Sequence, residues 1–141
     1  MERRTFNEYI RRFNSEDATA FDDYIAPTMK MLNGSLEFRG VDGMRDHYES
    51  KIWPYFIEKL NVLRFVSDDD TAAVQLWTQF TARHDADETL FGPVKKGDRF
   101  DYRGVIMYEI EDGKFISITV AYNSFVNTKA TGETIDMGMP H

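Results

Sequence analysis

Apolar and polar side chains alternate along the C-terminal part of the chain, in two long runs separated by a short polar segment. The runs are Arg99–Ile110 and Lys114–Phe125, and Glu111-Asp112-Gly113 joins them. Alternation with a period of two residues predicts β-strands, and Asp-Gly between such runs favours a tight hairpin. One face of this hairpin is predicted to be largely apolar and comprises Phe100, Tyr102, Gly104, Ile106, Tyr108, Ile110, Ile116, Ile118, Val120 and Tyr122. Because a sheet with one apolar face must be covered, we expect a second layer on that side.

The same alternation predicts two earlier strands. They are Ile57–Val66 and Thr71–His84, and a polar, glycine-containing loop follows them over residues 85–97. Trp77 is a large aromatic residue on the otherwise polar face of the second of these strands. It is either an ordinary exposed tryptophan or a contact with another subunit, and the second interpretation predicts a homodimer through the outer face of the sheet.

Apolar residues three and four positions apart predict helices in the first half of the chain. Thr5 and Glu8 match a capping box that opens a first helix, on which Phe6, Tyr9, Ile10 and Phe13 share one face. A second, short helix begins at Ser15 or Asp17 and is ended by Pro27, and Thr28–Leu32 is a short strand. A third helix begins at Asp42. These three helices are the expected cover for the sheet.

Composition narrows the class of protein. At 141 residues the chain is expected to form one domain over residues 1–126. A tail over 127–141 follows, which is expected to be loosely ordered or draped over a neighbour. Aromatic residues make up 14% of the chain, which is enough either to fill a core or to line a ligand cavity as well. The chain has no cysteine, which excludes disulfides and thiolate catalysis.

Charge and hydropathy exclude some partners. The net charge of −7 argues against nucleic acid, because phosphate binding requires clustered Lys and Arg. No apolar run approaches the length that spans a membrane, so a cytoplasmic protein without membrane contact is expected.

Two segments resemble those of a known superfamily. They are Phe38–Met44 continuing to Tyr48, and Gly104–Phe115. With the order of helices and strands, they resemble the nuclear transport factor two-like (NTF2-like) superfamily, in particular its SnoaL-like polyketide cyclase and ketosteroid isomerase branch, over roughly residues 5–125. The resemblance implies an α+β, cystatin-like fold, shaped as a cone, in which a strongly bent antiparallel sheet wraps around three N-terminal helices. It implies no particular reaction.

The enzymes of this superfamily offer positions to compare. Ketosteroid isomerases use a tyrosine as oxyanion donor, an aspartate base and a second acid, and these positions fall on Tyr9, Asn33 and near Ile106. An amide cannot take up a proton at neutral pH, so isomerisation by that mechanism is not expected. The Asp-Arg-Asp network of limonene epoxide hydrolases falls on Leu76, Thr78 and Val120, none of which ionises.

The remaining candidates for chemistry are polar residues predicted to face the pocket. Histidine is the natural proton carrier near pH 7. His47 is either a base, with Tyr9 as donor and Asn33 orienting the substrate, or a histidine at the rim or surface. No histidine pair has the spacing of metal ligands, so we expect neither metal nor cofactor. The expected substrate-binding residues are Tyr48, Trp53, Thr78, Phe80, Tyr102, Ile106, Tyr108, Ile118, Val120 and Tyr122.

Three functions are consistent with these features. The first is a cofactor-free enzyme of isomerase, cyclase or dehydratase type that acts by acid/base chemistry on a small hydrophobic cyclic compound. The second is a non-catalytic protein that binds such a ligand in the same pocket. The third is a dimeric interaction module that uses the outer face of the sheet.

Overall fold

The computed structural model describes residues 1–138. The helices are α1 (Arg3–Asn14), α2 (Thr19–Tyr24) and α3 (Gly40–Arg45), and α3 continues as the π-helix η1 (Asp46–Ile52). The strands are β1 (Ile25–Asn33), β2 (Leu36–Arg39), β3 (Phe56–Ser67), β4 (Thr71–Ala82), β5 (Arg99–Glu111), β6 (Lys114–Thr128) and β7 (Thr134–Asp136).

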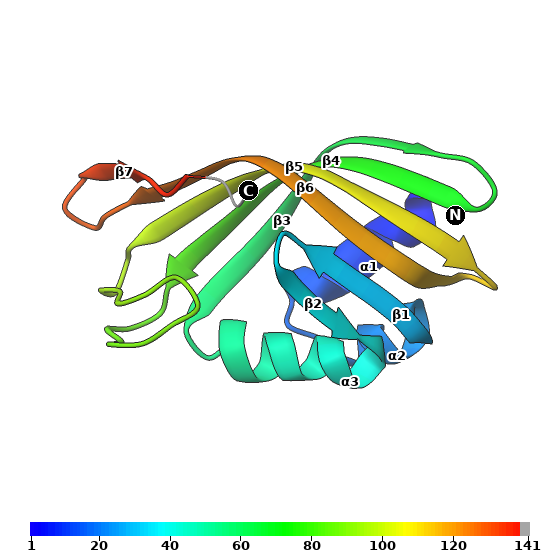
Figure 1. Ribbon diagram of the computed structural model, residues 1–141, viewed down its shortest axis with the longest axis horizontal. Coiled ribbons are helices and arrows are strands. Elements are labelled where there is room, and N and C mark those ends of the chain that lie inside the picture. The colour runs from blue at the N-terminus through cyan, green and yellow to red at the C-terminus, as the bar shows by residue number, and fades with distance from the viewer. Residues whose placement is uncertain (139–141) are drawn as a thin grey trace.

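The strands form one curled, unclosed sheet in the order β2-β1-β6-β5-β4-β3, and β7 pairs with β6. Figure 1 shows the long strands crossing above the helices, which lie beneath one half of the sheet with β1 and β2. β1 runs parallel to β6, whereas the other pairs are antiparallel. The expected all-antiparallel sheet is therefore wrong. Side-chain alternation records which face a residue occupies and not the direction of its neighbour, so it could not specify this pairing.

The helices bury the predicted apolar stripes but begin at other residues. Phe6, Tyr9, Ile10 and Phe13 of α1 are all buried, as predicted. α1 starts two residues before Thr5 and has no side-chain cap, so the predicted capping box is wrong. α3 starts at Gly40, which has φ +66, and a Cβ there would lie 2.7 Å from the carbonyl oxygen of Pro27. Glycine at this position lets α3 pack directly against β1.

Three further differences come from strand pairing that the alternation of side chains does not specify. The turn after Asn33 leads into β2, which the sequence did not predict. A register shift between β5 and β6 pairs Ile110 with Phe115, so Phe115 is fully buried and Ile116 is only partly buried. The tail is not all loosely ordered, because β6 continues to Thr128 and β7 pairs with it. Residues 139–141 of the predicted tail lie outside the described part of the chain.

Candidate functional site

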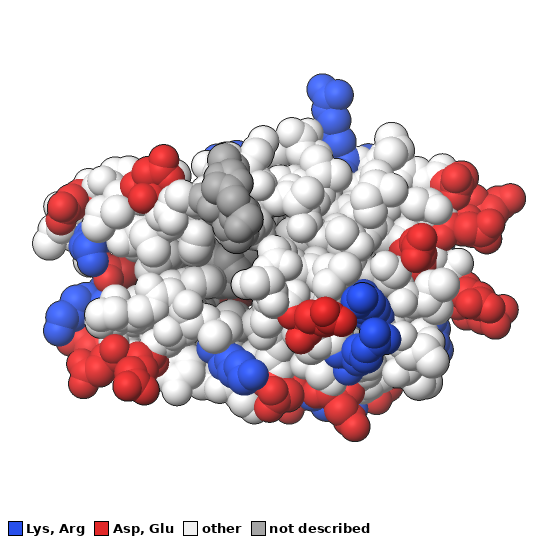
Figure 2. Space-filling model, in the orientation of Figure 1, with Lys and Arg blue, Asp and Glu red and all other residues white. Residues whose placement is uncertain are grey.

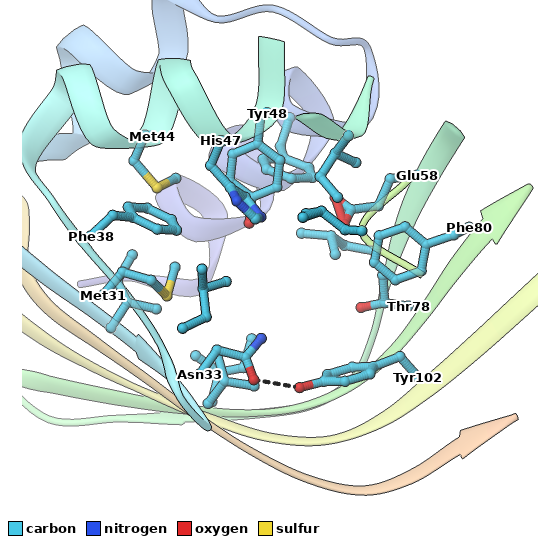
Figure 3. A pocket seen from close by; sticks show the side chains of 18 of the residues that line it. Met31, Asn33, Phe38, Met44, His47, Tyr48, Glu58, Thr78, Phe80 and Tyr102 are labelled. Carbon is cyan, nitrogen blue, oxygen red and sulfur yellow. Dashed lines mark hydrogen bonds between the residues drawn. The ribbon is translucent and has the colours of Figure 1, made fainter. Parts of the chain in front are cut away.

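A cavity of about 140 Å³ lies between the concave face of the sheet and the helices α1 and η1. Its lining is largely apolar and aromatic, with a few polar side chains that Figure 3 shows on its two sides. The lining residues are Tyr9, Phe13, Met31, Asn33, Leu36, Phe38, Met44, His47, Tyr48, Ile52, Glu58, Leu60, Thr78, Phe80, Leu90, Phe91, Tyr102, Ile106, Tyr108, Ile118 and Val120. A concave apolar space with few polar groups is typical of a small-molecule site.

Glu58 is the carboxyl group of this cavity. It faces inward on β3 between Phe56 and Leu60, and only 5% of its surface is exposed. Among residues 1–138, none makes a hydrogen bond to its Oε2 atom. Burial raises the pKa of Glu58 to about 8, because the charged form is poorly solvated there. At pH 7 this carboxyl is therefore mainly protonated and can donate a hydrogen bond or a proton.

The C-terminal end of α1 fixes the strand beside Glu58. The side-chain amide of Asn14 donates to the carbonyl of Leu60 at 3.0 Å and accepts from the Leu60 N–H at 2.8 Å. The ammonium of Lys59 donates to the Asn14 carbonyl oxygen at 2.7 Å. These bonds hold β3 against α1 within two residues of Glu58. The position of the carboxyl is thus set by backbone contacts, although its own oxygen lacks a partner.

His47 approaches the cavity from η1 and is 8% exposed. Its ring stacks on Phe38 with centroids 4.9 Å apart and meets the edge of Tyr48 at 4.7 Å. Burial, and secondarily the charge of Lys51, lower the pKa of His47 to about 4. The imidazole is therefore neutral at pH 7, so it can accept a proton. The interpretation of His47 as a surface histidine is wrong, whereas a position at the rim is consistent with its place in the cavity lining.

Two buried tyrosines and one partly buried tyrosine lie on the carboxyl side of the cavity. They are Tyr9, Tyr48 and Tyr108, and burial is the main cause that raises the pKa of each hydroxyl. Glu58 contributes further to the raised pKa of Tyr9 and Tyr48. These hydroxyls stay protonated at neutral pH and are available as hydrogen-bond donors.

Asn33 and Tyr102 form a second polar pair on the facing side of the cavity (Figure 3). The Tyr102 hydroxyl donates to Oδ1 of Asn33 at 2.6 Å. Asn33 ends β1 and Tyr102 lies on β5, with β6 between these strands. The bond thus crosses the curl of the sheet and is possible only because the sheet bends strongly.

The structure brings the three predicted catalytic residues, Tyr9, Asn33 and His47, to one cavity. Of the predicted substrate-binding residues, Trp53 and Tyr122 are not among those that line it. Trp53 is buried in the core against Phe21, with ring centroids 5.8 Å apart. The Tyr122 ring packs against Tyr102 at 4.2 Å. The others do line the cavity: Tyr48, Thr78, Phe80, Tyr102, Ile106, Tyr108, Ile118 and Val120.

Sequence reasoning missed Glu58. The signal was present, because Phe56, Glu58, Leu60 and Val62 share one parity in a strand whose other positions include Lys59 and Asn61. A single acid on an apolar face is costly unless it has a role or a partner. Unless the inward positions of this strand are separated from the outward ones, its carboxyl cannot be distinguished from a surface carboxyl.

Features for other ligands and partners are few in the described part of the chain. Within residues 1–138, no group of three or more His, Cys, Asp or Glu could hold a metal ion, and no helix is long and apolar enough to cross a membrane. Figure 2 shows acidic and basic side chains interspersed toward the ends and lower edge of one face, with a mostly uncharged middle.

Comparison with known families and structures agrees with this architecture. The model of the SnoaL-like domain family matches residues 6–118. No curated protein sequence is significantly similar to the chain.

Several solved structures share the fold. A candidate polyketide cyclase from Xanthomonas campestris pv. campestris is 19% identical, with a TM-score of 0.71 over 84% of this chain and 87% of that one. A SnoaL-like polyketide cyclase from Agrobacterium tumefaciens is 16% identical, with a TM-score of 0.65 over 84% and 88%. An LEH-like epoxide hydrolase from M. tuberculosis is 11% identical, with a TM-score of 0.64 over 85% and 80%.

Proposed function

The chain belongs to the SnoaL-like family of NTF2-like proteins, and we propose that it is an enzyme that acts by acid/base chemistry on a small, hydrophobic, cyclic, oxygenated compound. The observation that carries the proposal is Glu58, a buried carboxyl without a partner for Oε2 in the described structure, at the wall of an apolar cavity. Such groups are costly to bury and cluster at sites of proton transfer. Solved proteins of this fold include polyketide cyclases and an epoxide hydrolase.

The proposal assigns a role to each polar group. Glu58, protonated at neutral pH, donates to an oxygen of the substrate. Neutral His47 accepts the proton that leaves a carbon next to that oxygen, and the Tyr9 hydroxyl donates a further hydrogen bond to the oxygen as negative charge develops. The apolar walls exclude water, which strengthens these electrostatic contacts. Isomerisation, cyclisation and dehydration all use such a pair of proton transfers.

Proton exchange at a ring ketone tests this function without knowledge of the natural substrate. The probe is 2-tetralone in D₂O, and NMR measures the loss of the protons next to its carbonyl. The protein is expected to accelerate exchange above the buffer rate. Glu58→Gln and His47→Ala are each expected to reduce the acceleration about 100-fold, within the usual range for a group that transfers a proton. Tyr9→Phe should reduce it as well.

A matched control separates the site from general charge effects. Glu109→Gln removes an exposed carboxyl on the outer side of β5 and is expected to leave exchange unchanged. If 2-tetralone binds but wild type and Glu58→Gln both show only the buffer rate, the chain is a non-catalytic binding protein. That outcome would favour the second candidate function.

The partner that suits the outer face of the sheet is a second copy of the chain. Trp77 is not free there, because its Nε1 donates to Asp101 at 2.8 Å and the Arg103 guanidinium lies 4.4 Å from its ring. On the same face, Val105 and Met107 are 45% and 44% exposed. Exposed apolar side chains on a sheet favour an interface. Light scattering is expected to give twice the chain mass, and Val105→Glu is expected to reduce it; an unchanged mass would exclude Val105 from the interface.

A further inference from the structure

The amide of Asn33 is held so that its donor end is free. Its Oδ1 accepts the short hydrogen bond from Tyr102, and Figure 3 shows the Nδ2 end of the side chain turned toward the cavity. Among residues 1–138, none accepts a hydrogen bond from Nδ2. An amide nitrogen carries two donors, so this side of the cavity offers a donor fixed in direction by Tyr102.

Glu58 offers a second donor at a distance from the first. β1 and β3, which carry Asn33 and Glu58, are separated in the sheet by β6, β5 and β4. Because the sheet curls, the two side chains face the same cavity from different sides (Figure 3). Between them the register places apolar side chains, with Asn33 beside Val120 and Val120 beside Ile106. The site therefore has a polar pole at each end, and the sheet floor between them is apolar apart from the hydroxyl of Thr78 (Figure 3).

The charges of the lining disfavour anionic ligands. Of the described residues, no Lys or Arg lines the cavity, so an anion would meet no positive charge there. The cavity accommodates one ring, because cavities of about 150 Å³ bind single aromatic rings, and its open side leaves room for a second ring. A hydrogen-bond donor at each pole selects a ligand with two acceptors. Because the poles lie on different sides of the cavity, these two acceptors must lie at opposite edges of the ring system.

We infer that the cavity binds a neutral compound of one or two rings that carries two oxygen acceptors at opposite edges, one facing the carboxylic acid of Glu58 and the other facing Nδ2 of Asn33. This inference rests on the proposed function for the Glu58 end and adds Asn33 as a residue that determines specificity. Tyr102 is its positioning residue, since it occupies Oδ1 and so orients the amide.

A matched pair of ligands tests the second pole. The probes are trans-decalin-2,6-dione, with a carbonyl at each edge, and trans-2-decalone, with one. Calorimetry is expected to show that wild type binds the dione about fivefold tighter, the size of one hydrogen bond. Asn33→Leu is expected to abolish this preference while leaving the affinity for 2-decalone within about twofold. Asn123→Leu, which removes an exposed amide of β6, is the control and should keep the preference.

Other outcomes would overturn the inference and are distinct from failure of the enzyme proposal. If Asn33→Leu does not fold, Asn33→Asp retains an acceptor for Tyr102 but no donor, and loss of the preference remains the expected result. An equal preference in wild type and in these variants overturns the role of Asn33. Tighter binding of protonated 2-aminotetralin or of 2-naphthoate overturns a neutral ligand. If the inference is overturned but the protein still accelerates exchange of 2-tetralone, the proposed acid/base function stands. If wild type prefers the dione but does not accelerate exchange, only the proposed catalysis is contradicted.

Discussion

Glu58 and Asp98 are two carboxyl groups buried to a similar extent, 5% and 2% exposed, in opposite surroundings. Asp98 directly precedes β5 and accepts hydrogen bonds from the backbone N–H groups of Lys95 and Ala130, each at 2.9 Å. Burial alone would raise its pKa, but these bonds lower it below its ordinary value. Glu58 has no partner for Oε2 among residues 1–138, and burial raises its pKa to about 8.

The difference separates a structural acid from a chemical one. The charge of Asp98 is used to tie the 83–98 loop to the segment after β6, so the carboxylate stabilises the fold. The carboxyl of Glu58 ties nothing together and carries the cost of burial. An acid of the second kind makes sense where a proton must be given or taken inside an apolar space. Substitution of Glu58 and substitution of Asp98 should therefore have different effects on stability and on proton exchange.

The largest expected effect is on the pH dependence of stability. Glu58 has a folded pKa of about 8, above its ordinary value of 4.5, so the folded state binds the extra proton and loses stability as pH rises between these values. The loss is about 1.4 kcal/mol per pH unit inside this window, or about 3 kcal/mol from pH 5 to pH 8. Urea unfolding of wild type and Glu58→Gln at both pH values measures it as the difference between the two proteins.

The contribution of Asp98 to stability changes with pH in the opposite direction and over a different pH range. Its folded pKa is lowered, so its contribution is present above the ordinary value and is lost only in acid, as pH falls through the folded pKa. Asp98→Asn should therefore leave the slope between pH 5 and pH 8 unchanged. A slope that Glu58→Gln does not reduce would show that Glu58 is solvated or paired in solution.

Removal of each carboxyl should change stability in opposite directions. Asp98→Ala leaves the N–H groups of Lys95 and Ala130 without their charged acceptor and is expected to destabilise the protein by about 3 kcal/mol at pH 7. Glu58→Leu replaces a buried polar group without a partner by an apolar one of similar volume, and is expected to stabilise by about 1 kcal/mol. Urea denaturation midpoints provide both values. Destabilisation by Glu58→Leu would mean that the carboxyl supports the fold, and the comparison would then fail.

The sequence predicted the sheet and its helical cover better than it predicted the cavity. Alternation along β5 and β6 and the apolar stripe of α1 were enough to identify the sheet and its cover, because both are local patterns. The cavity is not local: the Tyr102–Asn33 bond joins residues 69 positions apart across the curl of the sheet. The parallel pairing of β1 with β6 likewise joins distant segments. The register shift that pairs Ile110 with Phe115 lies within one hairpin, but the alternation of side chains does not reveal it. Glu58 was readable from strand parity, but its missing partner was not.

The rate of proton exchange should follow the two groups of the cavity. Exchange requires neutral His47, with a pKa of about 4, and protonated Glu58, with a pKa of about 8. The expected rate is therefore highest between these values and falls about tenfold per pH unit beyond each limit. NMR exchange of 2-tetralone from pH 4 to pH 9.5 measures the profile. Asp98→Asn should keep both limbs, and a rate that increases through pH 8 would instead assign Glu58 as the base.

The smallest expected effect concerns the residue that holds Glu58 in place. Asn14→Ala removes the two amide contacts to Leu60 and should let β3 move from α1, so that water reaches the carboxyl. We expect the exchange rate at pH 7 to fall by about threefold and the upper limb of the pH profile to move below 8, toward the ordinary value of a carboxyl. Asn61→Ala is the matched control, because this amide of the same strand donates to Trp77 on the outer face. Since a loss of stability alone would lower the rate without moving the limb, an unshifted limb in Asn14→Ala would show that α1 does not set the surroundings of Glu58.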